Sequence, residues 1–130
     1  MQAPPRKGIA GMKILIIGGG GVIGQKLALA LARTGHVGGT PISQLTLADV
    51  VMPGTVDAPF DVQTRTCDIA NPASVANAIT ADTDLVYLLA AIVSAHAEED
   101  FDAGMKINLF GTYNVLERCR TLDTKPMVIL

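Results

Sequence analysis

The sequence predicts an α/β fold in which helices cover both faces of a doubly wound parallel sheet. Two observations lead to this prediction. Apolar segments of strand length alternate along the 130-residue chain with longer segments of helical character. The first apolar segment runs directly into four consecutive glycines, residues 18–21, and a stretch rich in Ala and Leu follows them. Strands that alternate with helices are typical of a parallel sheet covered on both faces.

The first half of the chain is expected to supply three strands and one helix. The apolar run at 13–17 is typical of a strand that is buried on both faces. Residues 22–33 favour a helix, whereas a cluster of glycines and a proline place a loop at 34–44. Two further strands are expected at 45–48 and 62–66.

The second half begins with a capped helix. Asn71 is a favoured N-cap residue and Pro72 suits the first helical position, so the helix should start here. Val75 and Ile79 would then form its buried face. Residues 84–89 have little polar character and predict a fourth strand.

A longer helix is expected at 101–120. A fifth strand is expected to begin at 127–130, and the sheet is expected to be truncated at this strand. One stripe of the helix should face the sheet, because apolar and small side chains recur at the spacing of helical turns. The stripe consists of Met105, Leu109, Thr112, Leu116 and Cys119.

Right-handed crossovers fix the expected order of these strands. Strand two lies beside strand one, strand three lies beyond strand two, and strand four crosses to the other side of strand one. The expected order is therefore 3-2-1-4-5. In such a sheet, ligands bind at the switch point, which is the crevice between strands one and four.

The glycine loop fits two spacings of a dinucleotide fingerprint. One is Gly19-x-Gly21-x-x-Gly24, and the other starts at Gly18 and has a glycine at every third position. Glycines permit a tight turn, a close approach of the backbone to a pyrophosphate and close packing of the next helix. The N-terminus of that helix offers free N–H groups to phosphates. A flexible loop is the alternative, but the strand before it and the helix after it favour a Rossmann-type nucleotide site.

Asp49 is a candidate for binding the adenosine ribose, because it ends the second strand 25 residues after Gly24, where the usual offset is ~20 residues. A carboxylate here accepts hydrogen bonds from the ribose hydroxyls and repels a 2′-phosphate. Val50 and Val51 follow, so no arginine stands there to hold that phosphate, and we expect NAD rather than NADP. An ordinary turn acid is the alternative.

Two other strand ends carry candidate cofactor contacts. Asp68 could accept a hydrogen bond from the adenine amine and Ile69 could pack on its ring, although Asp68 also fits an ordinary turn. Leu89, Ala90 and Ala91 end the fourth strand, where small residues would let the cofactor approach the switch point.

Composition argues against several other functions. The net charge is −2 and no basic stripe is present, so nucleic acid is not expected as a partner, and no apolar run has the length of a membrane span. Cys67 and Cys119 lack the spacing of a metal site or a disulfide framework, so we expect buried thiols in a cytoplasmic protein. His36 and His96 are interpreted as solvated loop residues. The acidic run 98–102 is interpreted as the start of a helix rather than a metal site.

Four segments together resemble the extended short-chain dehydrogenases/reductases, the NAD-dependent epimerase/dehydratase family. Residues 17–24 resemble its glycine motif, with Ile17 in the place of the usual threonine. Residues 67–69 resemble Gly-Asp-Ile/Leu, the adenine contact, with cysteine in place of glycine. Residues 84–91 resemble Asp-Val-Val-Phe-His-Leu-Ala-Ala, and residues 108–117 resemble Asn-Val-x-Gly-Thr-x-Asn-Leu-Leu-Glu.

A narrower resemblance, at 91–102 and 38–42, is to the D-erythronate dehydrogenase subgroup, which oxidises a sugar acid with NAD. Residues 1–11 include two prolines and lack an apolar signal-peptide core, and they are interpreted as a disordered extension. The family resemblance covers residues 12–130 and implies that they form the N-terminal part of an NAD-binding domain, without a substrate domain. It also implies a homodimer that uses the helix at 101–120.

The resemblance assigns the contacts with NAD to particular residues. The glycine loop and first helical turn would hold the pyrophosphate, and the strand ends would hold the ribose, the adenine and the inner part of the cofactor. Asn108 matches an asparagine that supports the catalytic relay of the family. The other expected contacts are Gly18, Gly21, Val22, Ile23, Gly24, Asp49, Asp68, Ile69, Leu89, Ala90 and Ala91.

The catalytic groups of the family are expected to be absent from these 130 residues. The proton donor of the family is a tyrosine followed four residues later by lysine, but Tyr87 is followed at that distance by Ala91 and Tyr113 by Glu117. The catalytic serine of the family also lies beyond strand five. No residue of this chain is therefore assigned a catalytic role.

These features predict the NAD-binding portion of an oxidoreductase that acts on the CH–OH group of a sugar acid or a related sugar derivative. Two alternatives are a non-catalytic dinucleotide-binding module and the N-terminal half of a nucleotide-sugar epimerase or dehydratase. A methyltransferase-like fold fits less well, because Ile17 stands where that class carries an acid.

Overall fold

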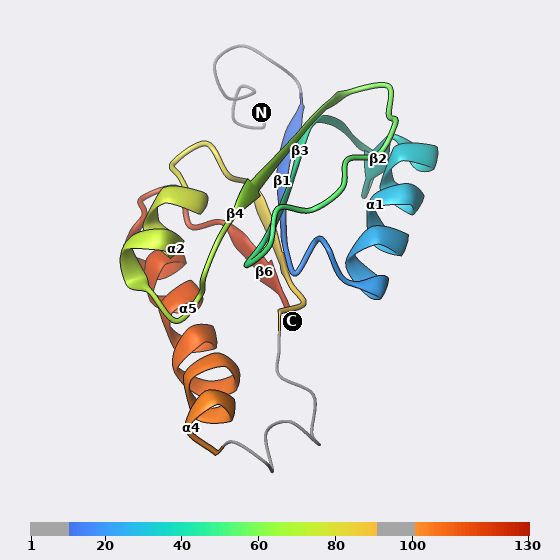
Figure 1. The fold of residues 1–130 in the computed structure, drawn as a ribbon. Coiled ribbons are helices and arrows are strands. Elements are labelled where there is room, and N and C mark those ends of the chain that lie inside the picture. Colours follow the sequence, from blue (N-terminus) through green and yellow to red (C-terminus); the bar gives the residue numbers. More distant parts are fainter. Residues whose placement is uncertain (1–10, 91–100) are drawn as a thin grey trace.

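A computed structural model of the chain describes residues 11–90 and 101–130 (Figure 1). In these residues a six-stranded sheet has helix α1 on one face and helices α2 and α5 on the other. The strands are β1 (Met12–Ile17), β2 (His36–Val37), β3 (Thr40–Asp49), β4 (Asp61–Thr66), β5 (Leu85–Leu88) and β6 (Met127–Ile129). The helical segments are α1 (Val22–Thr34), α2 (Pro72–Ala78), α4 (Phe101–Gly104), the π-helical η2 (Met105–Gly111) and α5 (Thr112–Thr121).

The parallel strands are neighbours in the order β4-β3-β1-β5-β6. This agrees with the neighbours expected for the five predicted strands, and β1 lies at the centre with β3 and β5 beside it. The complete sheet differs from the expected 3-2-1-4-5 order because it also contains β2, which pairs antiparallel with β3.

The loop expected at 34–44 is instead a β-hairpin, so that prediction was wrong. His36 pairs with Pro41 and Val37 pairs with Thr40, and the two residues between them are Gly38 and Gly39. Their φ angles are +56° and +82°, which a two-residue turn of the hairpin type requires and glycine readily adopts. The glycines that suggested a loop therefore form a tight turn, and β3 begins at Thr40 rather than at residue 45.

Helix α2 begins as the sequence predicts. The Asn71 Oδ1 atom accepts a hydrogen bond from the Ala73 N–H at 3.0 Å, and Pro72 occupies the first turn. Val75 and Ile79 are both fully buried. This cap and this face place α2 against the core that α5 also covers, with Val115 and Cys119 of α5 in the same cluster.

The helix expected at 101–120 is present, but the predicted buried stripe is wrong except at Cys119. Leu109 and Leu116 are 52% and 43% exposed, whereas Gly111 and Val115 are buried. The π-helical η2 includes Leu109 but not Leu116, which lies in α5. Buried positions 104, 111 and 115 each lie one residue before a predicted position, and the two sets coincide at Cys119.

Two clusters of buried side chains form the core, one on each face of the sheet. Leu15, Ile17 and Val86 belong to the face covered by α2 and α5, and Ile14 and Ile16 belong to the face covered by α1. Successive residues of a strand point to opposite faces, so the apolar run of β1 serves both clusters.

Within the described parts of the chain, no helix has the length and apolar character needed to cross a membrane.

Candidate dinucleotide-binding site

The glycine loop leaves the carboxyl end of β1 and passes directly against the end of β5. Gly18 has a φ of +94°, and a Cβ atom at this position would lie 2.7 Å from the Ala90 nitrogen and 2.9 Å from the Leu89 carbonyl carbon. Neither backbone can yield that space easily, so both the conformation and the packing require glycine here. The loop therefore begins in the crevice between β1 and β5, which is the switch point of the sheet.

Gly24 is needed because the first turn of α1 packs closely on the glycine loop, whereas the glycine motif suggested close packing of the helix on the sheet. A Cβ atom at Gly24 would collide with the Gly18 carbonyl oxygen and would lie 2.9 Å from the Gly19 Cα. The first turn of α1 thus packs on the glycine loop itself. At Gly21, by contrast, the nearest atom to an added Cβ would be the Gly18 oxygen at 3.5 Å, an ordinary contact.

The hydrogen bonds of the loop attach it to the end of β3. The Gly18 and Gly19 N–H groups both donate to the Ala48 carbonyl, at 2.8 and 2.9 Å. The next N–H, of Gly20, donates to the Asp49 Oδ2 atom at 3.0 Å. No side-chain hydrogen bond caps the N-terminus of α1, whose N-cap is Gly21. The first N–H groups of this helix lack intrahelical acceptors, and the oxygen atoms of a phosphate can accept their hydrogen bonds.

Asp49 lies where the sequence predicts, at the last position of β3 and beside the glycine loop. Its Oδ1 atom accepts a hydrogen bond from the Val50 N–H at 2.8 Å, while Oδ2 accepts from Gly20. An added Cβ atom at Gly20 would lie 3.1 Å from Oδ2, so glycine keeps this approach open. The carboxylate is thus fixed at the edge of the loop by two main-chain donors.

A cavity of about 230 Å³ opens where these elements meet. It brings together six of the predicted residues, which come from the glycine loop and from the ends of β3, β4 and β5. These are Gly18, Gly21, Asp49, Ile69, Leu89 and Ala90. The sequence reasoning did not assign four further lining residues to the site: Ile17, Val50, Cys67 and Ile107.

Cys67 forms part of the wall of this cavity and is 3% exposed. Burial raises the pKa of its thiol above the ordinary value, so the neutral form is favoured. A neutral thiol is a small apolar surface rather than a nucleophile. Its place next to Asp68 and Ile69 was the available signal, because the adenine motif of the family has glycine there.

Several predicted site residues are not among the described residues that line the cavity. Val22 and Ile23 are 72% and 64% exposed in the first turn of α1, and Gly24 lies buried behind the loop. The Asp68 Oδ1 atom accepts a hydrogen bond from the Ala70 N–H at 3.0 Å, which is the contact of a turn acid. Its role in binding adenine stays a prediction.

Three further side chains considered in the sequence lie apart from the cavity lining in the part of the chain that the structure describes. Asn108 is exposed on η2, and its carbonyl accepts a hydrogen bond from the Thr112 hydroxyl at 3.1 Å. Tyr87 packs against the core on the α1 face, and Tyr113 is 59% exposed on α5. Across residues 11–90 and 101–130, no three His, Cys, Asp or Glu side chains are grouped to hold a metal ion. Ala91, His96 and the acidic run from 98 to 100 lie outside the described residues.

A parallel sheet with a glycine loop at its switch point and an acid at the end of the neighbouring strand defines a Rossmann-type α/β protein. The sequence profile of the 3-beta hydroxysteroid dehydrogenase/isomerase family matches residues 15–129. The chain belongs to this family of NAD-dependent dehydrogenases and epimerases.

Two curated relatives are D-erythronate dehydrogenases, the subgroup that residues 91–102 and 38–42 resemble. The chain is 43% identical over 124 residues to D-erythronate dehydrogenase of Cupriavidus necator, a match that covers 91% of this chain and 37% of the relative. It is 40% identical over 118 residues to D-erythronate dehydrogenase of Haemophilus influenzae, with 91% of this chain and 36% of the relative covered. The chain thus spans little more than a third of the length of these relatives.

Solved structures show the same fold. A nucleoside-diphosphate-sugar epimerase from Agrobacterium tumefaciens superposes with a TM-score of 0.83 at 40% identity, covering 91% of this chain and 36% of that protein. A mutant uronate dehydrogenase from the same organism, complexed with NAD, superposes with a TM-score of 0.66 at 26% identity, covering 87% and 38%. These structures bear out the Rossmann-type architecture.

Proposed function

We propose that this chain binds NAD at the carboxyl end of its sheet and forms the cofactor-binding portion of an oxidoreductase that acts on the CH–OH group of a sugar acid. The observation that carries the proposal is the cavity in which the Gly18 turn, Asp49 and the end of β5 meet. A relative with this fold was solved in complex with NAD, which supports the choice of cofactor.

The residues of the cavity suit the parts of NAD in turn. The N-terminus of α1 suits the pyrophosphate, because its first N–H groups lack intrahelical acceptors. The glycines before it place no side chain in the way of that approach. Asp49 suits the ribose hydroxyls, and the carboxylate would repel a 2′-phosphate. Ile69 and the neutral thiol of Cys67 offer an apolar surface for the adenine, beside Asp68. Ala90 is a small residue of the cavity wall and leaves room for the inner part of the cofactor.

The sugar-acid substrate and the reaction rest on the relatives. Bound NAD would supply the hydride acceptor for oxidation of a secondary alcohol. The Tyr-x-x-x-Lys pattern of the family does not occur in the 130 residues, so we assign this chain binding and orientation rather than proton transfer. An epimerase or dehydratase is the second candidate, because the structure with a TM-score of 0.83 is a nucleoside-diphosphate-sugar epimerase.

Homodimer formation is proposed as well, on the strength of the exposed apolar side chains along the helices from 101 to 121. The largest of these are Phe101, Leu109, Phe110, Tyr113 and Leu116. Analytical ultracentrifugation tests this by comparing the oligomeric state of the chain with that of a variant carrying Phe110→Ser and Tyr113→Ser. We expect the variant to lose the dimer.

Calorimetric titration of the 130-residue chain with NAD and with NADP tests the proposed cofactor. We expect weak NAD binding, weaker NADP binding, and no dehydrogenase turnover with D-erythronate or a uronate. Asp49→Ala, which removes the proposed ribose acceptor, should bind NAD more weakly. Its matched control is Asp61→Ala, which removes an exposed carboxylate from the start of β4, away from the cavity. A folded chain that gives no heat with NAD would contradict the proposal, and turnover by this chain would contradict the assigned lack of proton-transfer groups.

A further inference from the structure

The glycine loop is held on its carbonyl side by a side chain outside the proposed cofactor contacts. Gln25 lies in the first part of α1 and is half-buried. Its Nε2 atom donates one hydrogen bond to the Gly19 carbonyl at 2.6 Å and one to the Gly54 carbonyl at 3.1 Å. An amide nitrogen carries two hydrogens, so these two contacts use both of them.

Gln25 and Asp49 hold opposite sides of one peptide group. The Gly19 carbonyl and the Gly20 N–H belong to the same peptide bond, and these two groups of a trans peptide point in opposite directions. Gln25 holds the carbonyl, and the Asp49 Oδ2 atom accepts from the N–H at 3.0 Å. Glycines have the greatest backbone freedom, so a peptide between two of them is the one most in need of such restraint.

Rotation of this peptide would turn the Gly19 carbonyl toward the Asp49 carboxylate. Two acceptors would then face each other, and Asp49 would lose one of the two main-chain donors that hold it. The second Gln25 contact, with Gly54, joins the same amide to the loop that follows Asp49. Gln25 thus restrains both chain segments that flank the carboxylate.

We propose that Gln25 is a positioning residue of the dinucleotide site: it fixes the Gly19–Gly20 peptide so that its N–H meets Asp49 and the carboxylate is set for the adenosine ribose. This inference rests on the proposed function, because the value of a fixed Asp49 lies in binding the cofactor. Gln25 acts through Asp49, since it is not among the described residues that line the cavity.

The substitution Gln25→Glu tests this role with little change of shape. A carboxylate has no hydrogens to donate and would face two carbonyl oxygens. We expect NAD affinity to fall by up to about tenfold, the loss expected when the Asp49 carboxylate is removed, and the preference for NAD over NADP to fall with it. The matched control is Gln44→Glu, which makes the same change at a half-buried glutamine of β3 away from the loop and should leave NAD affinity unchanged.

A double-mutant cycle separates positioning from a general loss of stability. In an Asp49→Ala background, Gln25→Glu should change NAD affinity by less than about twofold, because its effect passes through the missing carboxylate. A purely structural role would give the same fold-change in both backgrounds. Equal fold-changes would therefore overturn the proposal.

A measurement without cofactor distinguishes failure of this inference from failure of the proposed function. Asp49→Ala should shift the NMR resonance of the Gly20 amide in the otherwise unchanged chain and in the Gln44→Glu variant, because the amide loses its acceptor. The same replacement should leave that resonance nearly in place in the Gln25→Glu variant. An equal shift in all three backgrounds would overturn the role of Gln25, whereas absence of NAD binding by the folded chain counts against the cofactor alone.

Discussion

The two ends of the sheet carry cavities of similar size but of opposite construction. At the carboxyl end, a cavity of about 230 Å³ is walled by glycine backbone, apolar side chains and the carboxylate of Asp49. Toward the amino end, a cavity of about 210 Å³ is lined mainly by polar side chains, among them Lys13, Arg65 and Asp82. Volume alone therefore does not distinguish the two ends.

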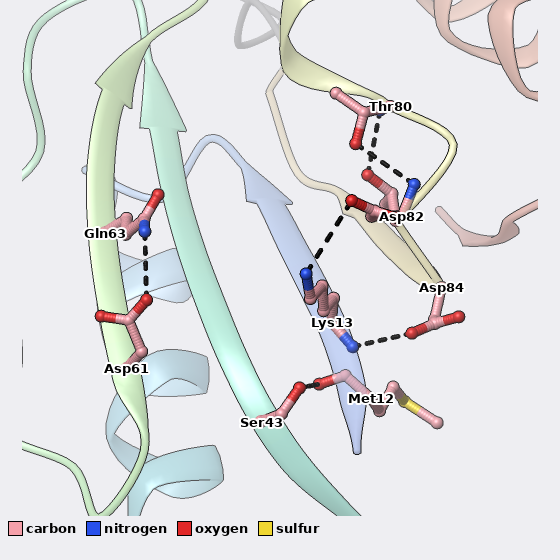
Figure 2. A network of polar contacts seen from close by, with 9 residues as sticks. Met12, Lys13, Ser43, Asp61, Gln63, Thr80, Asp82 and Asp84 are labelled. Carbon is pink, nitrogen blue, oxygen red and sulfur yellow. Dashed lines mark hydrogen bonds and ion pairs between the residues drawn. The ribbon is translucent and has the colours of Figure 1, made fainter. Parts of the chain in front are cut away.

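The difference lies in how the polar groups are engaged. Figure 2 shows the amino end, where Lys13 lies between Asp82 and Asp84. The Lys13 side-chain Nζ atom is 3.9 Å from the Asp82 carboxylate. The main-chain N–H of Lys13 donates a hydrogen bond to the Asp84 Oδ2 atom at 2.9 Å. Arg65 donates to the Asn77 carbonyl at 2.8 Å. The charged groups of Lys13 and Arg65 are thus in contact with other residues of the same chain. At the carboxyl end, main-chain N–H groups at an uncapped helix start are the groups offered to a ligand.

The largest expected effect is at Gly18. Gly18→Ala should lower the free energy of unfolding by about 2 kcal/mol or more, because alanine disfavours a positive φ and its Cβ would meet the backbone of Ala90 at 2.7 Å. Gly21→Ala is the control, with an expected loss below about 1 kcal/mol. Urea unfolding of both variants measures this, and equal losses would contradict the geometry of the loop.

The comparison of the two ends is tested most simply by removing one carboxylate from each. Asp49→Ala should weaken NAD binding about tenfold and reduce the discrimination against NADP, because a charged hydrogen-bond acceptor is lost. Asp82→Ala should leave NAD binding unchanged and lower the free energy of unfolding by less than about 1 kcal/mol, as for other exposed ion pairs. Calorimetry and urea unfolding give the two readouts. Weaker NAD binding in the Asp82 variant would break the comparison.

Replacement of Arg118 should change the stability of the fold without changing NAD affinity. Its guanidinium donates to the Ile79 carbonyl at 2.9 Å and the Ala76 carbonyl at 3.2 Å, which closes the end of α2 beside the amino-end cavity. Arg118→Ala should lower the free energy of unfolding by about 1–2 kcal/mol without a change in NAD affinity. Arg120→Ala is the control on the same helix, since its partner Glu117 is an exposed neighbour and the expected loss is below about 0.5 kcal/mol. Equal losses would contradict the capping role.

The smallest effect concerns pH and Cys67. Burial raises the pKa of this thiol above the ordinary 9.0, so the unfolded chain releases the proton first as pH rises. The contribution of Cys67 to stability is therefore complete below that ordinary value and is lost as pH rises above it. Urea unfolding between about pH 8 and pH 10 should show a decline in stability that is smaller in Cys67→Ala. An unchanged decline would show that this thiol does not take part.

Local sequence sufficed for the unit that carries the candidate site. The apolar run of β1, the glycines and the Ala- and Leu-rich α1 each show their structure within a few residues, and the crossover rule then places β5 beside β1. Asp49 was predictable for the same reason, because it directly ends a strand that lies next to β1.

What could not be predicted depends on contacts or on hydrogen-bond geometry that sequence spacing does not reveal. Gly38 and Gly39 form a tight turn rather than a loop, since their φ angles are positive. The helices from 101 to 121 bury Gly111 and Val115 rather than the predicted Leu109 and Leu116. Ile107 reaches the cavity from η2, and no spacing in the sequence relates it to the strand ends that form the rest of the wall.

Mapping the NMR amide resonances of the chain during titration with NAD tests the central claim most directly. We predict that the resonances of Gly18, Gly21, Asp49 and Ala90 shift with a common dissociation constant while those of Lys13 and Asp82 stay in place. Shifts confined to the amino end of the sheet, or no shifts in a folded sample at millimolar NAD, would contradict the account.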